Sequence, residues 1–463
     1  MKTLPLLGLA LLVATPARAQ DATARLDDLF SWVRPGMPGC AIAVSHRGEV
    51  VVNRAYGLAN LETAGPIGPR TVFDIGSVQK QFSAAAALLL VEEGRLSLTA
   101  DIREYLPELP NYGHRITLDH LMTHTSGIRD WVALMNFDET EDARTLIFRQ
   151  RGLNFAPGEQ WMYSNSNFEL VKEIVTRVSG MSFAEVARTR LFEPLGMMNT
   201  MYATDITTAE TGAHAYELEG DHWTPAMMLG NARGGGAILS TVTDLLIWND
   251  ALTNGRLGAF VTAKLQEPAR LNDGTALEYA RGLRVEDTPY GRAVTHGGSA
   301  RAFKALLVRL PDQALSFAML CNAGDESERN LEDRRIADLF LPEDLVRQGD
   351  SAEAAAQVGQ RPAPRARPAE TYATSEAELR AFSGRYESED LGAYFDVRSG
   401  DNAVVMQLNG AQTLTLPSVE RDLFQRGPLT VRFVRDAAGQ VTALDFSTPA
   451  LRNVRFARAQ GNH

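Results

Sequence analysis

The sequence predicts an α+β protein with an antiparallel sheet flanked by helices, an inserted all-helical lobe and a small C-terminal β-barrel-like domain. Alternating apolar runs near residues 40–60 and 291–322 are typical of strands, and a long segment with helical periodicity separates them. Strands from the two ends of a domain can share one sheet while the segment between them forms a separate lobe. Further short alternating runs near the C-terminus predict the second domain.

The N-terminal segment, residues 1–19, has the features of a secretory signal peptide. A lysine precedes an apolar stretch at residues 4–13, and Ala17-Arg18-Ala19 is a small-residue cleavage site. We therefore expect a periplasmic or secreted protein, cleaved near Ala19. No later apolar run reaches the ~18 residues that a membrane span needs. The net charge of −11 makes nucleic acid and anionic lipid poor candidates for partners.

The first folded domain is expected to span residues 20–347. It begins with a hairpin, because two alternating runs flank His46-Arg47-Gly48. A very apolar helix follows at residues 83–91, and helical periodicity continues through residues 115–200. Strand character returns in the runs GRAVTHGG, FKALLVRLP and ALSFAMLCN, which would complete the sheet.

The C-terminal part changes in composition. Residues 348–375 are rich in Ala, Pro and charge without an apolar period, which predicts a linker. Residues 376–463 contain alternating runs separated by turns such as SGDN and DAAGQ. We count six such runs, YFDVRS, AVVMQL, QTLTL, LTVRFVRD, VTALDFS and VRFARA, which predict a small β-barrel or sandwich.

The chain has two cysteines, Cys40 and Cys321, and both lie in strand-like apolar runs. Two alternatives stay open. The cysteines are either buried free thiols that pack as small hydrophobic residues, or they form a single disulfide in an oxidising compartment.

The first candidate for chemistry is the pair formed by Ser77 and Lys80. Residues three apart on a helix lie on one face, one turn from each other. An amine beside a hydroxyl is one way to make serine nucleophilic without histidine. The same spacing is common by chance in solvated helices, but the helix that follows is too apolar to be solvated. A lysine at the mouth of a buried helix needs a partner or a role.

Two further segments carry candidate residues. Tyr163 and Asn165 stand two apart in an extended stretch, and a positive charge nearby would favour the phenolate as a base. The alternative is a core tyrosine with its hydroxyl bonded outward. In His296-Gly297-Gly298, glycines in a strand indicate close approach of a ligand or backbone, and the histidine could orient substrate or pass a proton. The alternative there is a hairpin corner with an exposed histidine.

Together these three segments resemble the motif set of the serine β-lactamase and penicillin-binding-protein superfamily. The chain is most similar to the branch that contains class C β-lactamases, D-aminopeptidases, alkaline D-peptidases and related esterases. The stretches LDHLMTHTSGI, FAPGEQWMYSN, FEPLGMMNTMY and ARGGGAILSTVTDLLIW fit this branch too, and the resemblance covers roughly residues 25–345. It implies a β-lactamase-like fold. The tail resembles β-barrel domains appended to some D-aminopeptidase-like members.

The resemblance also implies catalytic roles. Ser77 would be the nucleophile and Lys80 its first proton acceptor. Tyr163 would be the base, or the acid that protonates the leaving group. His296 stands where the family has lysine or histidine.

Substrate binding and oxyanion stabilisation are implied in the same way. Asn165 would hold the acyl amide of the substrate, or Lys80. The backbone N–H groups of Ser77 and Ser299, the latter next to Gly298, would form the oxyanion hole.

The third motif departs from the Lys-Thr-Gly of penicillin-recognising members, because His296 and Gly297 replace its lysine and threonine. A mostly neutral histidine and a glycine would weaken the binding of a substrate carboxylate by roughly 1.5–3 kcal/mol. We therefore expect an ester, an amide or a D-amino-acid peptide rather than a β-lactam or a D-Ala-D-Ala terminus. The nearby Arg301 and Lys304 either restore a positive patch or face solvent.

The sequence thus predicts an exported serine hydrolase that acts through an acyl-enzyme on peptides with D-residues or on small esters and amides. Its partner would be a small-molecule or peptide substrate, with peptidoglycan-derived peptides among the candidates. The alternatives are a β-lactamase or D-Ala-D-Ala carboxypeptidase, and, in another class, a non-catalytic cell-wall-binding or regulatory module. No His, Cys and Asp cluster has metal-ligand spacing, so no metal or cofactor is expected. The oligomeric state stays open.

Overall fold

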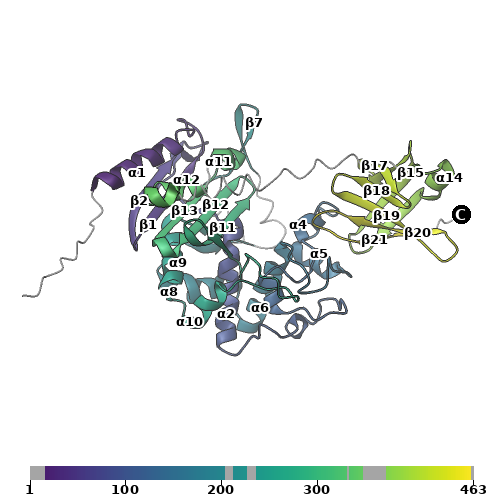
Figure 1. The fold of residues 1–463 in the computed structure, drawn as a ribbon, viewed down its shortest axis with the longest axis horizontal. Helices are drawn as coiled ribbons and strands as arrows, with labels where there is room; N and C mark the ends of the chain where they lie inside the picture. The colour runs from purple at the N-terminus through teal and green to yellow at the C-terminus, as the bar shows by residue number, and fades with distance from the viewer. Residues whose placement is uncertain (1–15, 204–211, 227–235, 331–332, 348–371, 460–463) are drawn as a thin grey trace, which may run out of the picture.

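The fold is known from a computed structural model, which describes residues 16–203, 212–226, 236–330, 333–347 and 372–459. Figure 1 shows a larger domain built around a sheet, a helical lobe beside it, and a smaller β-domain at the C-terminal end. Most of the predicted signal peptide and linker lies outside the described residues. Helix α1 (Pro16–Leu29) begins before the predicted cleavage point near Ala19.

The central sheet has six antiparallel strands and combines the two ends of the larger domain, as predicted. Its order is β10-β11-β12-β13-β1-β2. The strands are β1 (Cys40–His46), β2 (Glu49–Tyr56), β10 (Arg284–Thr288), β11 (Gly291–Ala300), β12 (Phe303–Leu310) and β13 (Leu315–Cys321). The predicted hairpin joins β1 to β2, and both turn residues, Arg47 and Gly48, have positive φ. Such a two-residue turn matches the twist of the flanking strands.

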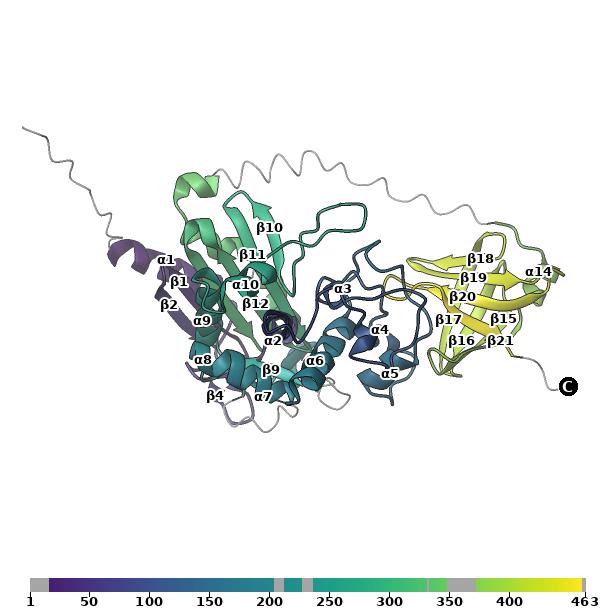
Figure 2. The same cartoon turned by 90° about the horizontal axis from the view of Figure 1, so that it is seen from below.

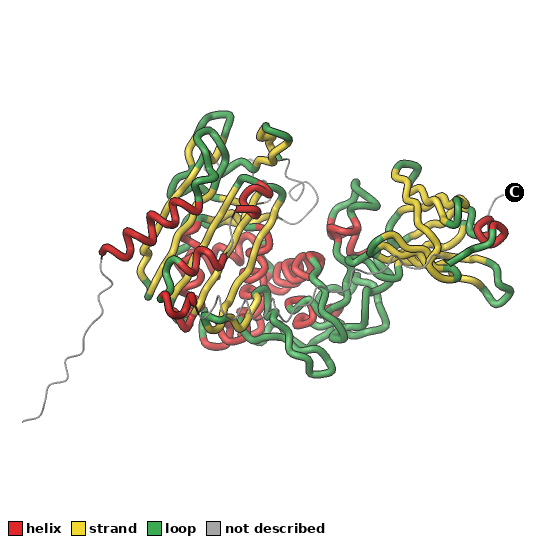
Figure 3. The backbone as a smooth tube through the Cα atoms, turned by 45° about the horizontal axis from the view of Figure 1, so that its top comes forward, coloured by secondary structure: helices red, strands yellow, loops and turns green. Residues whose placement is uncertain are grey.

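Both faces of the sheet are buried, and β1 shows why. Successive side chains of a strand point to opposite faces. Ile42 and Val44 pack with Leu26 and Phe30 of the N-terminal segment and with residues of α12 (Asp333–Asp338). Ala41 belongs to the cluster on the other face, where α9 (Val242–Thr253) contacts β1 and β13. Figure 3 shows helices along the sheet, and the barrel at the far end of the molecule.

The inserted lobe is helical in its larger part, as predicted. Its helices are α2 (Lys80–Glu92), α3 (Leu118–Met122), α4 (Trp131–Leu134), α5 (Ala143–Arg149), α6 (Asn165–Ser179), α7 (Phe183–Ala187) and α8 (Glu193–Leu195), and α10 (Ala259–Leu265) lies against α2. Helix α6 ends at Gly180, whose φ of 74° suits a left-handed C-cap.

The insert also contains short strands that the all-helical expectation did not include. A three-stranded sheet pairs β5 (Phe73–Asp74), β9 (Ala237–Ser240) and β6 (Met201–Ala203), and two hairpins pair β3 (Leu58–Asn60) with β4 (Gly65–Pro66) and β7 (Tyr216–Glu219) with β8 (His222–Pro225). Strands of two to four residues are too short for an alternating pattern, so only their pairing partners identify them.

The two cysteines face each other in the register of β1 and β13 and form a disulfide. Their Cα atoms are 4.0 Å apart. This resolves the alternative that the sequence left open, and it joins strands from the two ends of the domain.

The C-terminal domain is a closed barrel of eight antiparallel strands. They are β14 (Gly384–Ser388), β15 (Ala393–Ser399), β16 (Ala403–Leu408), β17 (Gln412–Glu420), β18 (Leu423–Arg426), β19 (Leu429–Arg435), β20 (Val441–Ser447) and β21 (Val454–Arg458). The six predicted runs correspond to six of these strands. The remaining two, β14 and β18, have five and four residues and little alternation, and closure of the barrel supplies their partners.

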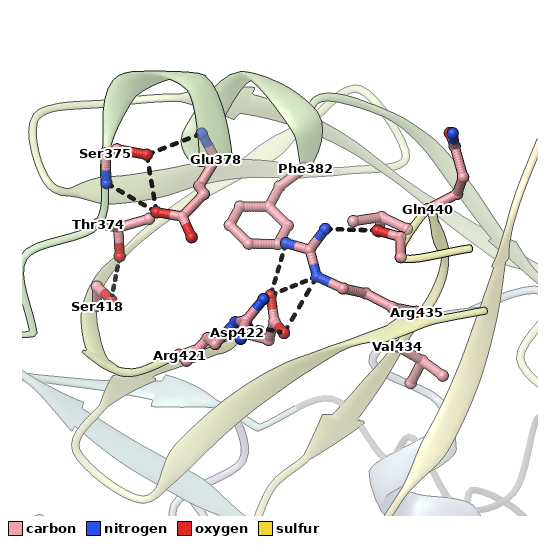
Figure 4. Close-up of polar contacts among 12 residues, drawn as sticks. Thr374, Ser375, Glu378, Phe382, Ser418, Arg421, Asp422, Val434, Arg435 and Gln440 are labelled. Carbon is pink, nitrogen blue, oxygen red and sulfur yellow. Dashed lines mark hydrogen bonds and ion pairs between the residues drawn. The ribbon is translucent and has the colours of Figure 1, made fainter. Parts of the chain in front are cut away.

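A short helix, α14 (Glu376–Ala381), packs against the barrel (Figure 4). Ser375 and Glu378 form a capping box at its start. Just beyond the helix, Phe382 stacks on Phe433 with 4.3 Å between ring centroids. The neighbouring Arg435 binds Asp422 at 2.8 Å. The Arg435 guanidinium also lies over the Phe382 ring, 5.2 Å from its centroid, so the end of the helix contacts the barrel wall through Phe382.

Figure 2 shows the barrel beside α4 and α5 of the helical lobe, away from the central sheet. In the parts of the chain that the structure describes, no helix has the length and apolar character needed to cross a membrane.

Candidate active site

Ser77 lies in a tight 3₁₀ turn, Gly76–Gln79, that leads directly into the buried helix α2. Strand β11 runs against this turn. A Cβ on Gly298 would overlap the carbonyl oxygen of Ile75, and a Cβ on Gly76 would lie 2.7 Å from the backbone nitrogen of Ser299. Gly76 and Gly298 are therefore both needed for the strand to reach the turn. Of the strand's glycine pair, for which the sequence predicted close approach of a ligand or backbone, Gly298 is the one that a backbone approaches.

Gly297 behaves differently from its neighbour. A Cβ at this position would meet a single atom, the carbonyl oxygen of Ala305, at 3.9 Å. Its lack of a side chain is thus not required by backbone packing.

The predicted residues Ser77, Lys80 and Tyr163 meet at one point. The Ser77 Oγ lies 3.0 Å from the Lys80 Nζ and accepts a hydrogen bond of 2.6 Å from the Tyr163 hydroxyl. Lys80 also donates to the Oδ1 of Asn165 at 2.9 Å. Helical spacing explains the first contact, whereas the other two join α2 to the start of α6.

Burial changes the chemistry of Lys80, which is only 3% exposed. Loss of solvent lowers the pKa of its ammonium to about 7, although the negative charges of Asp130 and Glu169 act in the opposite direction. An amine with this pKa is largely uncharged slightly above neutral pH. It can then accept the proton of the Ser77 hydroxyl.

Burial has the opposite consequence for Tyr163. It raises the pKa of the phenol above its ordinary value, even though the hydrogen bond with Ser77 opposes the shift. The expectation that Lys80 favours the phenolate is therefore not met. Tyr163 is a protonated donor in this geometry, which suits an acid better than a base.

Asp130, which the sequence analysis did not single out, orients Asn165. Its two oxygens accept hydrogen bonds of 3.1 Å from the backbone N–H and from the Nδ2 of Asn165. The amide oxygen of Asn165 is thereby turned toward Lys80. The signal in the sequence was modest, because Asp130 looks like an ordinary N-cap residue, a role it also fills for α4.

His124, just beyond the end of α3, is a buried residue that also supports the site. It is fully buried with a φ of 59°, and its Nδ1 accepts the backbone N–H of Ser164 at 3.2 Å. Its ring centroid is 4.3 Å from that of Tyr163. Burial, with the nearby Lys80, keeps the pKa of His124 well below its usual value, so the ring is a neutral support for Tyr163.

His296 lies beside the site, but its two ring nitrogens bind other groups. Nδ1 is 2.6 Å from the carbonyl oxygen of Gly297, and Nε2 is 3.0 Å from the Tyr279 hydroxyl. The carbonyl only accepts, so Nδ1 donates to it and Nε2 accepts from Tyr279. Burial, reinforced by the charge of Lys80, lowers the pKa of His296 to about 4. The imidazole is therefore neutral at physiological pH, as expected from the sequence.

Ser77 stands between two cavities, of about 360 Å³ and about 510 Å³. Ser77, Tyr163 and Ser299 line both. The smaller cavity is further lined by Asp74, Lys80, Trp131, Val132, Asn165, Phe168, Glu169, Lys172 and Arg301, among others. The larger one is further lined by Trp161, Tyr279, Arg284, His296, Gly297, Gly298 and Lys304, among others.

Each cavity contains charged side chains. In the smaller cavity, the Lys172 Nζ binds Glu169 at 2.9 Å, on the face of α6 that also carries Asn165. In the larger cavity, Lys304 donates to the Ser299 Oγ at 3.2 Å and lies 3.4 Å from Asp325. Of the two cations left open by the sequence, Lys304 points into a cavity, whereas Arg301 is exposed beside the other.

Comparison with known proteins supports the relationship that the motifs suggested. A family model described as Beta-lactamase matches residues 19–341. Penicillin-binding protein 4* of Bacillus subtilis (strain 168) is 27% identical over 317 residues, which are 62% of this chain and 68% of that protein. A D-aminopeptidase of Gluconobacter oxydans (strain 621H) is 31% identical over 319 residues, covering 66% of this chain and 59% of that enzyme. A D-aminopeptidase of Brucella anthropi is 29% identical over 298 residues, 62% of this chain and 56% of that enzyme. The chain therefore spans less than two thirds of these D-aminopeptidases.

Solved structures share the fold across almost the whole chain. The octameric penicillin-binding protein homologue from Pyrococcus abyssi has a TM-score of 0.59 at 22% identity and covers 95% of this chain and 99% of its own. SurE has a TM-score of 0.61 at 22% identity, with 96% and 99% covered. The similarity to these solved structures shows the fold alone. The match to the family model shows that the sequence pattern is shared as well. The family model matches residues 19–341, and Ser77 lies at the centre of this β-lactamase-like domain. The chain is therefore a serine hydrolase of the beta-lactamase family.

Proposed function

We propose that the protein is an exported hydrolase in which Ser77 attacks peptides with D-residues, or small esters and amides, through an acyl-enzyme. One observation carries the proposal. The Ser77 Oγ contacts both the Lys80 Nζ and the Tyr163 hydroxyl, at the junction of two cavities. A hydroxyl held between a proton acceptor and a proton donor is suited to acyl transfer.

The proposed reaction begins when the free amine of Lys80 takes the Ser77 proton as Oγ attacks the substrate carbonyl carbon. The backbone N–H groups of Ser77 and Ser299 stabilise the oxyanion. Tyr163 gives its proton to the leaving group as the scissile bond breaks, and it recovers one from Lys80. A water molecule then attacks the acyl carbonyl carbon as the free amine of Lys80 takes its proton. That proton passes to the Ser77 Oγ as the acyl–oxygen bond breaks, which releases the acid and restores Ser77 and the free amine.

The two cavities divide the substrate in this proposal. Asn165 lines the smaller cavity, so the acyl part binds there, and the larger cavity takes the leaving group. The carboxylate of Glu169 in the smaller cavity suits the ammonium group of an N-terminal D-residue. The names of two matched relatives, both D-aminopeptidases, support the same substrate class.

The decisive experiment is labelling with a fluorophosphonate or penicillin probe, with peptide mapping of the modified residue. We expect a covalent adduct on Ser77 that is absent from Ser77→Ala. Turnover of D-aminoacyl anilides and small esters should vanish in the same variant. No labelling of Ser77, with Ser77→Ala as active as the wild type on every substrate tried, would contradict the proposal.

A second candidate is a β-lactamase or D-Ala-D-Ala carboxypeptidase, which Lys304 favours. Its ammonium lines the leaving-group cavity, where it could bind a substrate carboxylate in place of the charge that His296 lacks. Nitrocefin turnover or release of D-Ala would identify this activity. A third possibility, a non-catalytic cell-wall-binding module, predicts binding that Ser77→Ala leaves unchanged.

Export is proposed on two grounds. The N-terminal residues resemble a signal peptide, and the disulfide between Cys40 and Cys321 suits an oxidising compartment. Fractionation of expressing cells, with mass spectrometry of the mature N-terminus, would test it. Retention in the cytoplasm with residues 1–19 intact would contradict export.

A further inference from the structure

We infer that the C-terminal barrel is a positioning part of the active site, because it binds the two segments that carry Asp130 and Tyr163. The contact of the barrel with Arg129 is the first grip, and its contact with Asn154 is the second grip. This inference rests on the proposed role of Ser77. The barrel reaches the helical lobe through a buried ion pair on one side and a network around a buried asparagine on the other.

The first grip is the guanidinium of Arg129, whose side chain is 3% exposed. Its NH1 binds the carboxylate of Asp390 at 2.8 Å and the side-chain oxygen of Gln150 at 3.1 Å. Asp390 belongs to the barrel, between β14 and β15. Its carbonyl oxygen also accepts from the Gln150 Nε2 at 2.6 Å, so the barrel turn and the lobe are joined at several points.

The backbone of Arg129 connects this grip to the site. Its carbonyl oxygen accepts from the Ser166 Oγ at 2.7 Å, at the start of α6. The next residue, Asp130, holds both nitrogens of Asn165, and Asn165 in turn contacts Lys80. A displacement of Arg129 would therefore be transmitted to Lys80, the proton acceptor of Ser77, through the hydrogen bonds of the intervening residues.

The second grip is Asn154, which is 7% exposed. Its Oδ1 accepts the backbone N–H of Arg452 at 2.8 Å, and its Nδ2 donates to the carbonyl oxygen of Ala450 at 3.0 Å. Both partners lie in the barrel loop between β20 and β21. The same Nδ2 is 3.1 Å from the sulfur of Met162, the residue before Tyr163. The Arg452 guanidinium adds a contact of 2.6 Å to Gln160.

The two grips act on different catalytic groups, one on the Lys80 side and one on the Tyr163 side of Ser77. Reacting groups tolerate little misplacement, and a shift of about 1 Å can slow a reaction about 100-fold. A buried guanidinium without its carboxylate is also strongly disfavoured. Docking of the barrel and order at the site are thereby coupled, although the described barrel residues do not line either cavity.

The test uses the full-length protein and four variants, of which Asp390→Glu keeps the carboxylate of the first grip. Asp390→Asn removes the charge of the first grip, and Asn154→Ala removes the second. Asn409→Asp is the matched control, because it breaks a hydrogen bond of 3.1 Å from the barrel to the carbonyl of Phe137, in which neither Arg129 nor Asn154 takes part. The measurements are the rate of Ser77 phosphonylation by a fluorophosphonate, kcat and KM for an ester, and folding by circular dichroism.

We expect Ser77 of Asp390→Asn and Asn154→Ala to be phosphonylated about 10- to 100-fold more slowly, with KM for the ester nearly unchanged, because orientation rather than binding is lost. Asn409→Asp should stay within about twofold of the wild type, and Asp390→Glu, which restores the carboxylate, should recover part of the rate. If Asp390→Asn fails to fold, Asn154→Ala still tests the inference.

Two results would overturn the inference. One is a wild-type rate of Ser77 phosphonylation in both folded grip variants. The other is an equal loss in Asn409→Asp, which would assign the effect to docking in general. Failure of the wild type to label at Ser77 would instead contradict the proposed function, so the two failures are distinguishable.

Discussion

At the scale of single residues, the charges around Lys80 determine the pH at which it can accept a proton. Asp130 and Glu169 raise its pKa, Lys172 lowers it, and burial lowers it most. The neutral rings of His124 and His296 and the protonated Tyr163 face the same amine without adding charge. The value of about 7 is therefore a balance that single substitutions can shift in either direction.

The first prediction concerns the pH profile of kcat/KM. Activity should rise with pH through the Lys80 pKa of about 7, because only the free amine accepts the Ser77 proton. Glu169→Gln removes a charge that raises this pKa, so its acid limb should move to lower pH. Lys172→Met removes a charge that lowers it, so its acid limb should move to higher pH. Shifts in the same direction would contradict the electrostatic balance.

A second prediction concerns substrate choice. If Glu169 binds the ammonium of an N-terminal D-residue, Glu169→Gln should lose a charge-assisted hydrogen bond of about 1.5–3 kcal/mol. We expect kcat/KM for a free D-aminoacyl anilide to fall about 10- to 100-fold, with a much smaller change for its N-acetylated form. The acetylated substrate is the control within the same variant. Equal losses on both substrates would exclude this role.

At the scale of elements, the contact between β11 and the turn that carries Ser77 brings the backbone of Ser299 against that of Gly76, the residue before Ser77. Neither element alone forms this arrangement, since it needs a strand without a side chain at Gly298 and a turn with positive φ at Gly76. The sequence indicated a close approach at the glycine pair. It did not indicate which glycine makes it.

A third prediction follows from this contact. Gly298→Ala would force its Cβ into the carbonyl of Ile75, so we expect a stability loss of about 1–3 kcal/mol and slow labelling of Ser77. Gly297→Ala is the matched control, because its Cβ would meet one atom at 3.9 Å. Thermal unfolding and probe labelling of both variants provide the measurement. A damaging Gly297→Ala together with a harmless Gly298→Ala would refute the packing argument.

A fourth prediction concerns the pairing of β1 with β13. The disulfide between Cys40 and Cys321 closes a long loop of chain, so the variant with both cysteines changed to serine should lose about 2–4 kcal/mol of unfolding free energy. Dithiothreitol should produce a similar loss in the wild type. The serine variant supplies the control, since the reductant should not change its urea denaturation curve.

At the scale of the whole molecule, the barrel and the helical lobe are joined by polar groups that are buried on docking. The pair formed by Arg129 and Asp390 is buried in this interface, with side chains 3% and 17% exposed. Phe137 adds an apolar contact with Phe446 of the barrel, 5.6 Å between ring centroids. A linker is the only connection that the sequence suggested between the domains, yet these contacts make them one assembly.

A fifth prediction measures this interface. Asp390→Asn leaves a buried guanidinium without its carboxylate, so we expect the free energy of unfolding to fall by about 3–5 kcal/mol. The double variant Arg129→Met with Asp390→Asn removes the charge as well, and it should be less destabilised than Asp390→Asn alone. Chemical denaturation of the wild type, the single variants Arg129→Met and Asp390→Asn, and the double variant compares them. A double variant as unstable as the sum of both single changes would show that the pair is not coupled.

The sequence by itself determined the features that follow from short-range periodicity. Ser77 and Lys80 meet because a helical turn separates them, α6 ends at Gly180, and the strands alternate as their pairing requires. Only the tertiary structure decided the features that depend on burial and on distant partners. Three such features are the protonated state of Tyr163, the hydrogen bonds from Asn165 to Asp130, and the ion pair between Arg129 and Asp390. Each forms where segments far apart in the chain pack together and exclude water. No local sequence pattern encodes the exclusion of water, because it depends on how the whole chain packs.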